Sequence, residues 1–216
     1  MNRAESSHIA SAVSGYFLEE VPGATGAWAN RQLAPSVDGG IVRHTSSGAT
    51  NTLVFGNDRK PNESILTPFA NGGGLSIQQL TDQTGNGFHA TTNNPNREPL
   101  IYSGGSIITY GAESSILFDG VDDFLQNVSY STNDNAPFTT VIVTANNDCN
   151  MPTQGLVCVV NNSLAEVTQL YMDQDPTRIR VWFGGSPNTG PGTNTDLNTF
   201  SDALKVFIVL RKPNGL

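Results

Sequence analysis

The segment that most constrains how this chain can fold is a polar, glycine-bearing stretch at residues 82–90, Asp-Gln-Thr-Gly-Asn-Gly-Phe-His-Ala. Its central pair, Asn86-Gly87, predicts a two-residue hairpin turn, because both residues tolerate the positive φ angles of a type I′ turn. A second turn at Asp119-Gly120 lies between two alternating apolar segments and predicts another hairpin. Two such turns indicate antiparallel β-structure.

Asp82 has two candidate roles, one in the turn and one as an acid or ligand. Its carboxylate can accept hydrogen bonds from backbone N–H groups across the turn, while Gly85 and Gly87 supply positive φ. This conformational explanation is complete, so we interpret Asp82, Gly85, Asn86 and Gly87 as turn-forming residues. Asp119 and Gly120 receive the same interpretation. His89 has no visible catalytic partner in the sequence.

Short strand-like segments recur along the rest of the chain, and they do not alternate with helices as in a parallel sheet. With 22 Gly and 12 Pro among 216 residues, this pattern predicts a single all-β sandwich or barrel. We expect one short helix at 62–70 and a Gly-, Pro-, Asn- and Thr-rich loop at 184–198. The expected strands are 27–33, 40–45, 51–55, 75–80, 100–102, 107–110, 114–118, 124–130, 138–144, 155–160, 167–172, 178–183 and 204–210.

The two ends of the chain differ from this pattern. Residues 7–20 place apolar side chains three and four positions apart, which predicts an amphipathic helix or folded arm that ends at Pro22-Gly23. The arm either packs on the sandwich edge or anchors the protein to a partner. We therefore divide the chain into an arm at 1–23 and a sandwich at 24–216.

The apolar strand at 204–210 is followed by a turn and then by Leu216, with no returning strand. Because an open apolar edge promotes association, we expect the missing strand to come from another subunit or from sequence beyond Leu216. A homo-oligomer follows from the first alternative.

Charge excludes several classes of partner. The formal net charge is −8, the pI is about 4.7 and only 14% of residues are charged. Nucleic acids and anionic membranes both bind through Lys and Arg, so neither is expected as a partner. The N-terminus lacks the apolar core of a secretory signal, and for Cys149 and Cys158 free thiols are favoured over a disulfide.

The densest group of carboxylates is Asp119, Asp122 and Asp123. Converging oxygen ligands can bind Ca²⁺, but the spacing is not that of an EF-hand, and carboxylates also form turns. We predict no metal and no other cofactor.

Several motifs carry a resemblance to a known family. They are residues 82–90, Arg-Glu-Pro-Leu-Ile at 97–101 and Ile-Leu-Phe-Asp-Gly-Val-Asp-Asp-Phe-Leu at 116–125, preceded by 22–33 and 40–47. This order resembles concanavalin A-like (laminin-G-like) domains of bacteriophage virion proteins, which are distantly similar to the catalytic domain of fungal α-L-arabinofuranosidase B. The resemblance implies a jelly-roll β-sandwich with a short N-terminal helix or arm, a role in a phage particle, and contact with sugars.

The catalytic residues of that arabinofuranosidase domain have no counterpart here. Its nucleophile is a Glu in a Met-Glu-aromatic strand, and its acid is an Asp in a Gly-Gly-Asp loop. The nearest segment in this chain, Gly184-Gly185-Ser186, has serine instead. A Ser-His-Asp site built on His8, His44 or His89 lacks a nucleophile-elbow sequence. We therefore predict that the chain is not an enzyme.

Aromatic side chains are the candidates for sugar contact. In the segment 178–183, Arg180 and Trp182 share one face of the expected strand and Phe183 lies on the other. The alternative places Trp182 in the core, where large aromatics are common. The candidate carbohydrate-binding residues are Trp182, Arg180, Trp28 and Tyr171.

The resemblance thus implies a virion structural protein, which would be made in the host cytoplasm. It would be a capsid decoration, a head fibre or a tail-associated component, attached to other virion proteins through its arm. A carbohydrate-binding adhesin for host-surface glycans is one alternative. A polysaccharide-cleaving enzyme is another.

Overall fold

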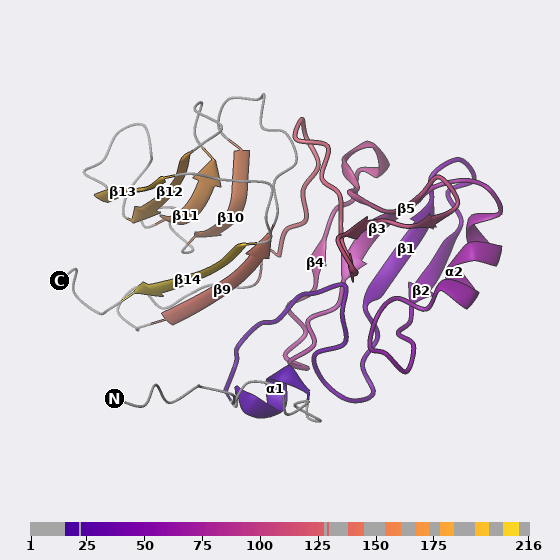
Figure 1. The fold of residues 1–216 in the computed structure, drawn as a ribbon, viewed down its shortest axis with the longest axis horizontal. Coiled ribbons are helices and arrows are strands. Elements are labelled where there is room, and N and C mark those ends of the chain that lie inside the picture. The colour runs from indigo at the N-terminus through magenta and orange to yellow at the C-terminus, as the bar shows by residue number, and fades with distance from the viewer. Residues whose placement is uncertain are drawn as a thin grey trace, which may run out of the picture.

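The computed structural model describes residues 16–21, 23–127 and 129, together with the strands between residues 138 and 211 (Figure 1). From residue 154 onward, it describes the backbone of those strands. The described residues form mostly strands with few helices, which confirms a β-rich fold.

The first sheet is entirely antiparallel and is built around β3 (Leu75–Leu80). β3 pairs with β1 on one side and with β4 and β5 on the other. The strand order is β2-β1-β3-β5-β6, with β4 paired to β3. The other bounds are β1 (Gly40–His44), β2 (Thr50–Leu53), β4 (Ala90–Thr91), β5 (Leu100–Ser103) and β6 (Ser106–Ile107).

The core of the described part lies between this sheet and helix α2 (Glu63–Ala70). The side chain of Asn62 caps the helix by accepting from the Ser64 N–H at 3.2 Å. Asn71 ends it in the left-handed region at φ 43°. The fully buried core side chains are Val42, Leu53, Leu66, Ala70, Leu75, Ile77 and Ile101.

The remaining strands form separate antiparallel groups. β9 (Phe138–Thr144) pairs with β14 (Lys205–Arg211) over its whole length. A four-stranded sheet has the order β10-β11-β12-β13 and lies on the side of the molecule away from α2 (Figure 1). Its strands are β10 (Gln154–Val160), β11 (Val167–Met172), β12 (Arg178–Phe183) and β13 (Thr193–Asn198). Three short elements complete the described part: 3₁₀ helix η1 (Pro95–Arg97) and strands β7 (Thr109–Tyr110) and β8 (Glu113–Ser114).

Most predicted strands and the helix at 62–70 are confirmed, but four expectations are wrong. Residues 27–33 form no strand, because the loop at 82–88 binds their backbone groups. Part of the expected loop at 184–198 is β13, a polar segment that becomes a strand by pairing with β12. In 124–127, Gln126 makes only an isolated bridge to Thr91. Of the expected strand at 114–118, only Ser114 lies in a strand, β8, and Leu117 makes an isolated bridge to Leu100.

Helix α1 (Phe17–Glu20) is the described part of the helix expected at 7–20. Residues 1–15, which include His8, lie outside the described residues. So do Cys149 and the side chain of Cys158.

Candidate functional site

The carboxylate of Asp82 is buried and its hydrogen bonds run to backbone and hydroxyl donors around it. Oδ1 accepts from the N–H groups of Ala27 and Thr84, both at 3.1 Å, and from the Thr84 hydroxyl at 2.7 Å. Oδ2 accepts from the Phe88 N–H at 3.1 Å. Three of these bonds close the loop on itself, and the bond to Ala27 ties it to a segment 55 residues away. The Asp82 carboxylate therefore stabilises the loop and its contact with Ala27.

These bonds decide the protonation of Asp82. Burial alone would raise its pKa, but the hydrogen bonds from Thr84, Ala27 and Phe88 outweigh burial and hold the pKa below the ordinary value of 3.8. Asp82 therefore stays ionised at neutral pH and is no candidate for a general acid.

The predicted type I′ turn at Asn86-Gly87 is wrong. Positive φ occurs at Gly85 (83°) and Gly87 (81°), whereas Asn86 does not adopt it. β3 and β4 do pair as a hairpin, with Leu80 opposite Ala90, so the connection spans residues 81–89. A loop of this length is shaped by the Asp82 carboxylate and not by a two-residue turn.

Gln83 is the residue that sequence reasoning missed. Its side chain is buried and fully hydrogen-bonded: Oε1 accepts from the Leu33 N–H at 2.6 Å, and Nε2 donates to the carbonyls of Ala29 and Arg31 at 3.2 and 2.9 Å. Its own N–H donates to the Ala27 carbonyl at 2.9 Å. One glutamine thus holds a seven-residue stretch that has no strand partner.

Two more bonds join the same segments. The indole Nε1 of Trp28 donates to the Phe88 carbonyl at 2.6 Å, and Nδ2 of Asn86 donates to the Thr25 carbonyl at 3.1 Å. We call residues 82–88 the docking loop, because each of these bonds fastens residues 25–33 to it. Trp28 also packs against the core and is partly buried.

The two described histidines are held by backbone groups. Nδ1 of His89 accepts from the Asp82 N–H at 3.1 Å. Nδ1 of His44 accepts from the N–H groups of Ser46 and Ser47 at 3.2 and 3.4 Å, so its Nε2 carries the proton and donates to the Ala70 carbonyl at 2.9 Å. In both rings the lone pair of Nδ1 is engaged by backbone N–H groups, so Nδ1 of neither ring is available as a catalytic base.

The hairpin predicted at Asp119-Gly120 is also wrong. The flanking residues pair with different strands, Leu117 with Leu100 and Gln126 with Thr91. Between them, Oδ1 of Asp119 accepts from the N–H of Val121 at 2.8 Å and more weakly from the next two N–H groups. Gly120 takes a φ of 74°. Asp119 therefore shapes a turn that crosses from one strand to another.

The carboxylates of Asp119, Asp122 and Asp123 have ligand atoms within 4.8 Å of one another. Each carboxylate has a partner. Asp119 accepts from the N–H groups just described, Asp122 forms an ion pair with Arg97 Nε at 3.2 Å, and Asp123 accepts from the Asp119 N–H at 2.9 Å. The Val121 N–H lowers the pKa of Asp119, while burial and its acidic neighbours raise the pKa of Asp123. Backbone donors and an arginine thus each engage one oxygen of these three carboxylates.

Glu98 is a further buried carboxylate. Its Oε1 accepts from Arg43 Nε at 2.9 Å, and Oε2 accepts from the Ser76 hydroxyl at 2.6 Å. The Arg43–Glu98 ion pair links β1 to the residues just before β5, and Ser76 of β3 lies between them. It is a structural ion pair with both oxygens satisfied.

The other carbohydrate candidates lie on the four-stranded sheet. The register of β11 and β12 places Tyr171 opposite Arg180 and Gln169 opposite Trp182. Three of the four predicted residues are therefore neighbours on two adjacent strands, and Trp28 is not part of this group. Their side chains lie outside the described part of the structure.

Comparison with protein-family models, curated proteins and solved structures finds no match for this chain. Among the described residues, no helix has both the length and the hydropathy to cross a membrane.

Replacement of Gln83 tests the docking loop. In Gln83→Ala, the Leu33 N–H and the carbonyls of Ala29 and Arg31 lose their partners, so we expect the free energy of unfolding to fall by roughly 2–4 kcal/mol. Urea denaturation followed by tryptophan fluorescence measures this loss. The control Gln126→Ala removes an exposed glutamine side chain and should change stability by less than about 0.5 kcal/mol. Equal effects of the two variants would contradict the role of Gln83.

The pH dependence of the free energy of unfolding tests the structural role of the Asp82 carboxylate. Because its folded pKa lies below 3.8, its contribution is present above that pH and is lost as pH falls through the folded pKa. Asp82→Asn should therefore be less stable than the wild type at neutral pH, by about 2 kcal/mol, and the difference should shrink steadily below about pH 4. Parallel stability curves for the two proteins across this range would contradict the assignment.

Proposed function

We propose that this chain is a non-enzymatic structural protein of a bacteriophage particle, which displays a concanavalin A-like jelly-roll β-sandwich. The phage role rests on the resemblance carried by the motifs at 82–90 and 116–125, and the use of the polar residues in these motifs supports the non-enzymatic part. Asp82, Gln83 and Asp119 are satisfied by backbone groups, and His89 accepts from one. Residues that look chemically active in the sequence serve to hold the fold.

The enzyme alternative gains no support from the described carboxylates. Glycoside hydrolysis needs two carboxylates that face each other across a cleft. The clustered acids of the described part lie on one exposed turn, and Asp119 and Asp122 are bound by backbone N–H groups and by Arg97. The buried acids Asp82 and Glu98 are enclosed by their partners.

The arm has a defined exit point on the domain, which favours its use as an anchor. The Arg59 guanidinium lies 4.3 Å from the centre of the Tyr16 ring, and the Leu18 N–H donates to the Leu33 carbonyl at 3.0 Å. Phe17 and Val21 remain 50% and 42% exposed. Residues 16–21 are thus fixed to the domain while they present apolar side chains outward, as a contact with another virion protein requires.

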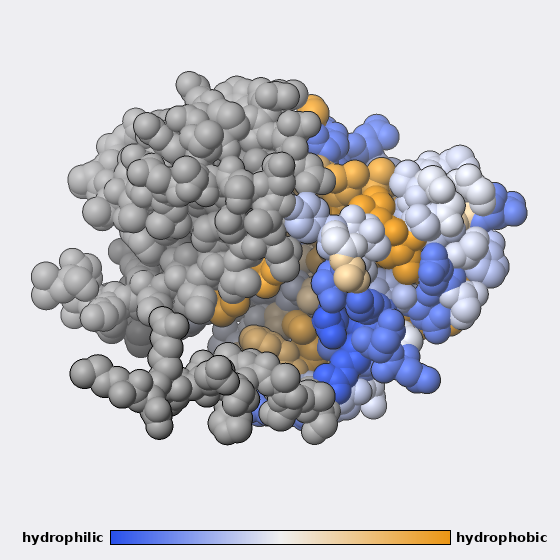
Figure 2. Space-filling view, viewed as in Figure 1, coloured by the Kyte–Doolittle hydropathy of each residue, from blue (hydrophilic) through white to orange (hydrophobic). Residues whose placement is uncertain are grey.

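Apolar exposure also occurs at the Asp119 turn. Leu117, Phe118 and Val121 are 46%, 47% and 68% exposed. On the face seen in Figure 2, apolar residues gather in a band beside strongly hydrophilic patches. Such a surface suits a protein that packs against neighbours in an assembly, including further copies of itself.

Removal of residues 2–15 tests the anchor while it leaves the contacts of Tyr16 and Leu18 intact. We expect the shortened protein to fold with wild-type stability and to be absent from purified particles after complementation of a phage that lacks the gene. Quantitative mass spectrometry of the particles measures incorporation. Exposed Ile65→Ser is the control and should be incorporated normally. Wild-type incorporation of the shortened protein would contradict anchoring through residues 2–15.

A second candidate function is the binding of a host-surface glycan by the four-stranded sheet. It is favoured by the register of β11 and β12, which brings Tyr171, Arg180 and Trp182 onto neighbouring positions. Aromatic and arginine side chains on adjacent strands are suited to stacking on a sugar ring and to hydrogen bonding with it.

Binding of purified protein to host polysaccharide tests this second candidate. We expect Trp182→Ala to weaken binding by at least about tenfold, measured by biolayer interferometry, while Trp28→Phe leaves it unchanged. Unaltered binding of Trp182→Ala would contradict a site on this sheet. Release of reducing sugar by the wild type would contradict the non-enzymatic proposal itself.

A further inference from the structure

We propose that Asn86 is a site of spontaneous chemical modification, at which its side-chain amide is converted to a carboxylate and the docking loop is loosened as a result. The reaction needs no enzyme and consumes only water. It does not depend on the phage role proposed above. Its effect falls on residues 25–33, which the docking loop holds in place.

The Asn86-Gly87 pair has the sequence that favours this reaction. The backbone nitrogen of Gly87, after losing its proton to the solvent, attacks Cγ of Asn86. A bond forms between these two atoms and the bond between Cγ and Nδ2 breaks, so the side-chain nitrogen takes up a proton and leaves as ammonia. Water then opens the succinimide ring at either carbonyl, which gives aspartate or isoaspartate at position 86. Glycine favours the first step because it has no side chain to shield its nitrogen.

The structure leaves this pair accessible. Asn86 and Gly87 are both exposed and lie outside any helix or strand. A Cβ added at Gly85 or Gly87 would meet no neighbouring heavy atom within 4 Å, so the chain here has room to turn. Within the described part, the Gly87 N–H makes no hydrogen bond. The attacking nitrogen therefore has no partner to give up.

Two hydrogen bonds restrain Asn86. Its Nδ2 donates to the Thr25 carbonyl at 3.1 Å, and its N–H donates to the Thr84 hydroxyl oxygen at a longer 3.4 Å. The side chain must leave Thr25 before it cyclises. Because a single exposed hydrogen bond is weak, we expect this restraint to slow the reaction by less than about tenfold.

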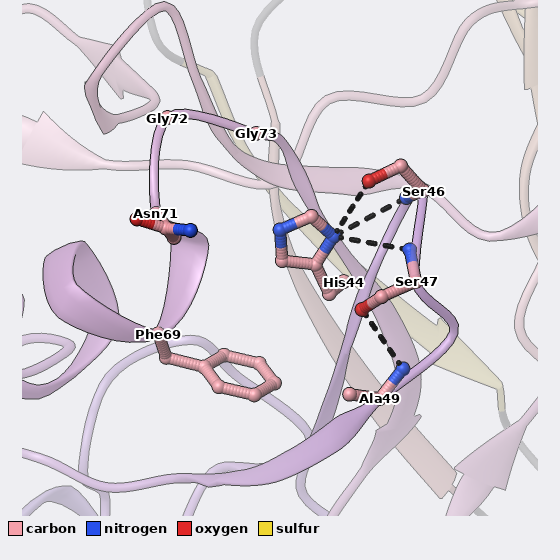
Figure 3. A pocket seen from close by; sticks show the side chains of 8 residues that line it. All are labelled: His44, Ser46, Ser47, Ala49, Phe69, Asn71, Gly72 and Gly73. Atoms are coloured by element: carbon pink, nitrogen blue, oxygen red, sulfur yellow. Dashed lines mark hydrogen bonds between the residues drawn. The ribbon is translucent and has the colours of Figure 1, made fainter.

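The pair Asn71-Gly72 provides an internal comparison. Asn71 ends α2 in the left-handed region, with φ 43° and ψ 44°, and is followed by Gly72 and Gly73 (Figure 3). This ψ turns the Gly72 nitrogen to the side of the backbone away from the Asn71 side chain. Rotation toward Cγ would break the bond from the Gly73 N–H to the Ala70 carbonyl at 2.7 Å. Asn71 should therefore react more slowly than Asn86.

The products cannot keep the docking loop as it is. A carboxylate at position 86 has no N–H to donate to the Thr25 carbonyl, and it adds negative charge to the loop that encloses Asp82. Isoaspartate also inserts its Cβ into the backbone, within the stretch that Asp82 closes through its bonds to Thr84 and Phe88. Both products thus weaken the hold on residues 25–33.

Storage of the purified protein in mildly alkaline buffer, followed by peptide mapping with mass spectrometry, tests the reaction. We expect the mass change from amide to acid, with isoaspartate detected by enzymatic methylation, to accumulate at Asn86 at least about tenfold faster than at Asn71. The rate should rise with pH, because the attacking nitrogen must first lose its proton. Asn214, in the third Asn-Gly pair, lies outside the described residues and is mapped separately.

Amide hydrogen exchange of residues 25–33 tests the effect on the loop. Asn86→Asp reproduces one product and should raise this exchange by about tenfold. Asn96→Asp makes the same change of charge at an exposed position outside the docking loop and should leave it unchanged. Storage should raise exchange in the wild type but not in Asn86→Gln, because the longer side chain cyclises far more slowly.

Three results would each overturn the proposal. The first is a reaction at Asn86 that is no faster than the reaction at Asn71. The second is equal exchange of residues 25–33 in Asn86→Asp and Asn96→Asp. The third is an equal change on storage in the wild type and in Asn86→Gln.

Discussion

The hydrogen bonds from Asp82 and Gln83 to residues 25–33 are the interaction on which the rest of the described structure depends. This segment enters the domain without a strand partner, and buried backbone groups without partners are costly. The Asp82 carboxylate and the Gln83 carboxamide are adjacent just after the end of β3, and together they supply hydrogen-bond acceptors and donors to this segment. The Leu33 carbonyl then receives the Leu18 N–H, so the position of α1 also follows from this loop.

How far the sequence predicts this fold depends on whether a segment finds its partners locally. The helix at 62–70 carries its own cap at Asn62, and the strands β3, β9 and β12 carry apolar patterns, so all of these were predicted. Residues 27–33 alternate as a strand would, but the side chain of Gln83 replaces the neighbouring strand. Nothing in the local pattern reveals a partner 50 residues away.

The same distinction applies to the candidate sites. The turn role of Asp82 follows from a local motif, whereas its bond to Ala27 depends on the tertiary fold. The Asp119 turn was placed correctly, but its flanks pair with β4 and β5 residues instead of with each other. The contact between the His44 and Phe69 rings could not be predicted, because the two rings meet only once α2 has packed on the sheet.

The described contacts divide the residues into those that hold the fold and those that are exposed at the surface. The polar side chains of Asp82 and Gln83 in the docking loop are enclosed and satisfied, while apolar side chains on α1 and at the Asp119 turn are exposed. Under the proposed function, such a protein would act through the surfaces that it presents, namely the arm and the four-stranded sheet. Among the described residues, the buried acids Asp82 and Glu98 and the two histidines are hydrogen-bonded within the fold.

Amide hydrogen exchange measured by NMR on the intact protein tests the central claim most directly. If the docking loop holds residues 25–33, the amides of Ala27 and Leu33 will exchange at least on the order of 1,000-fold more slowly than in an unstructured peptide, although neither lies in a helix or strand. Exchange of these two amides at the unstructured rate, with β3 still protected, would contradict the account.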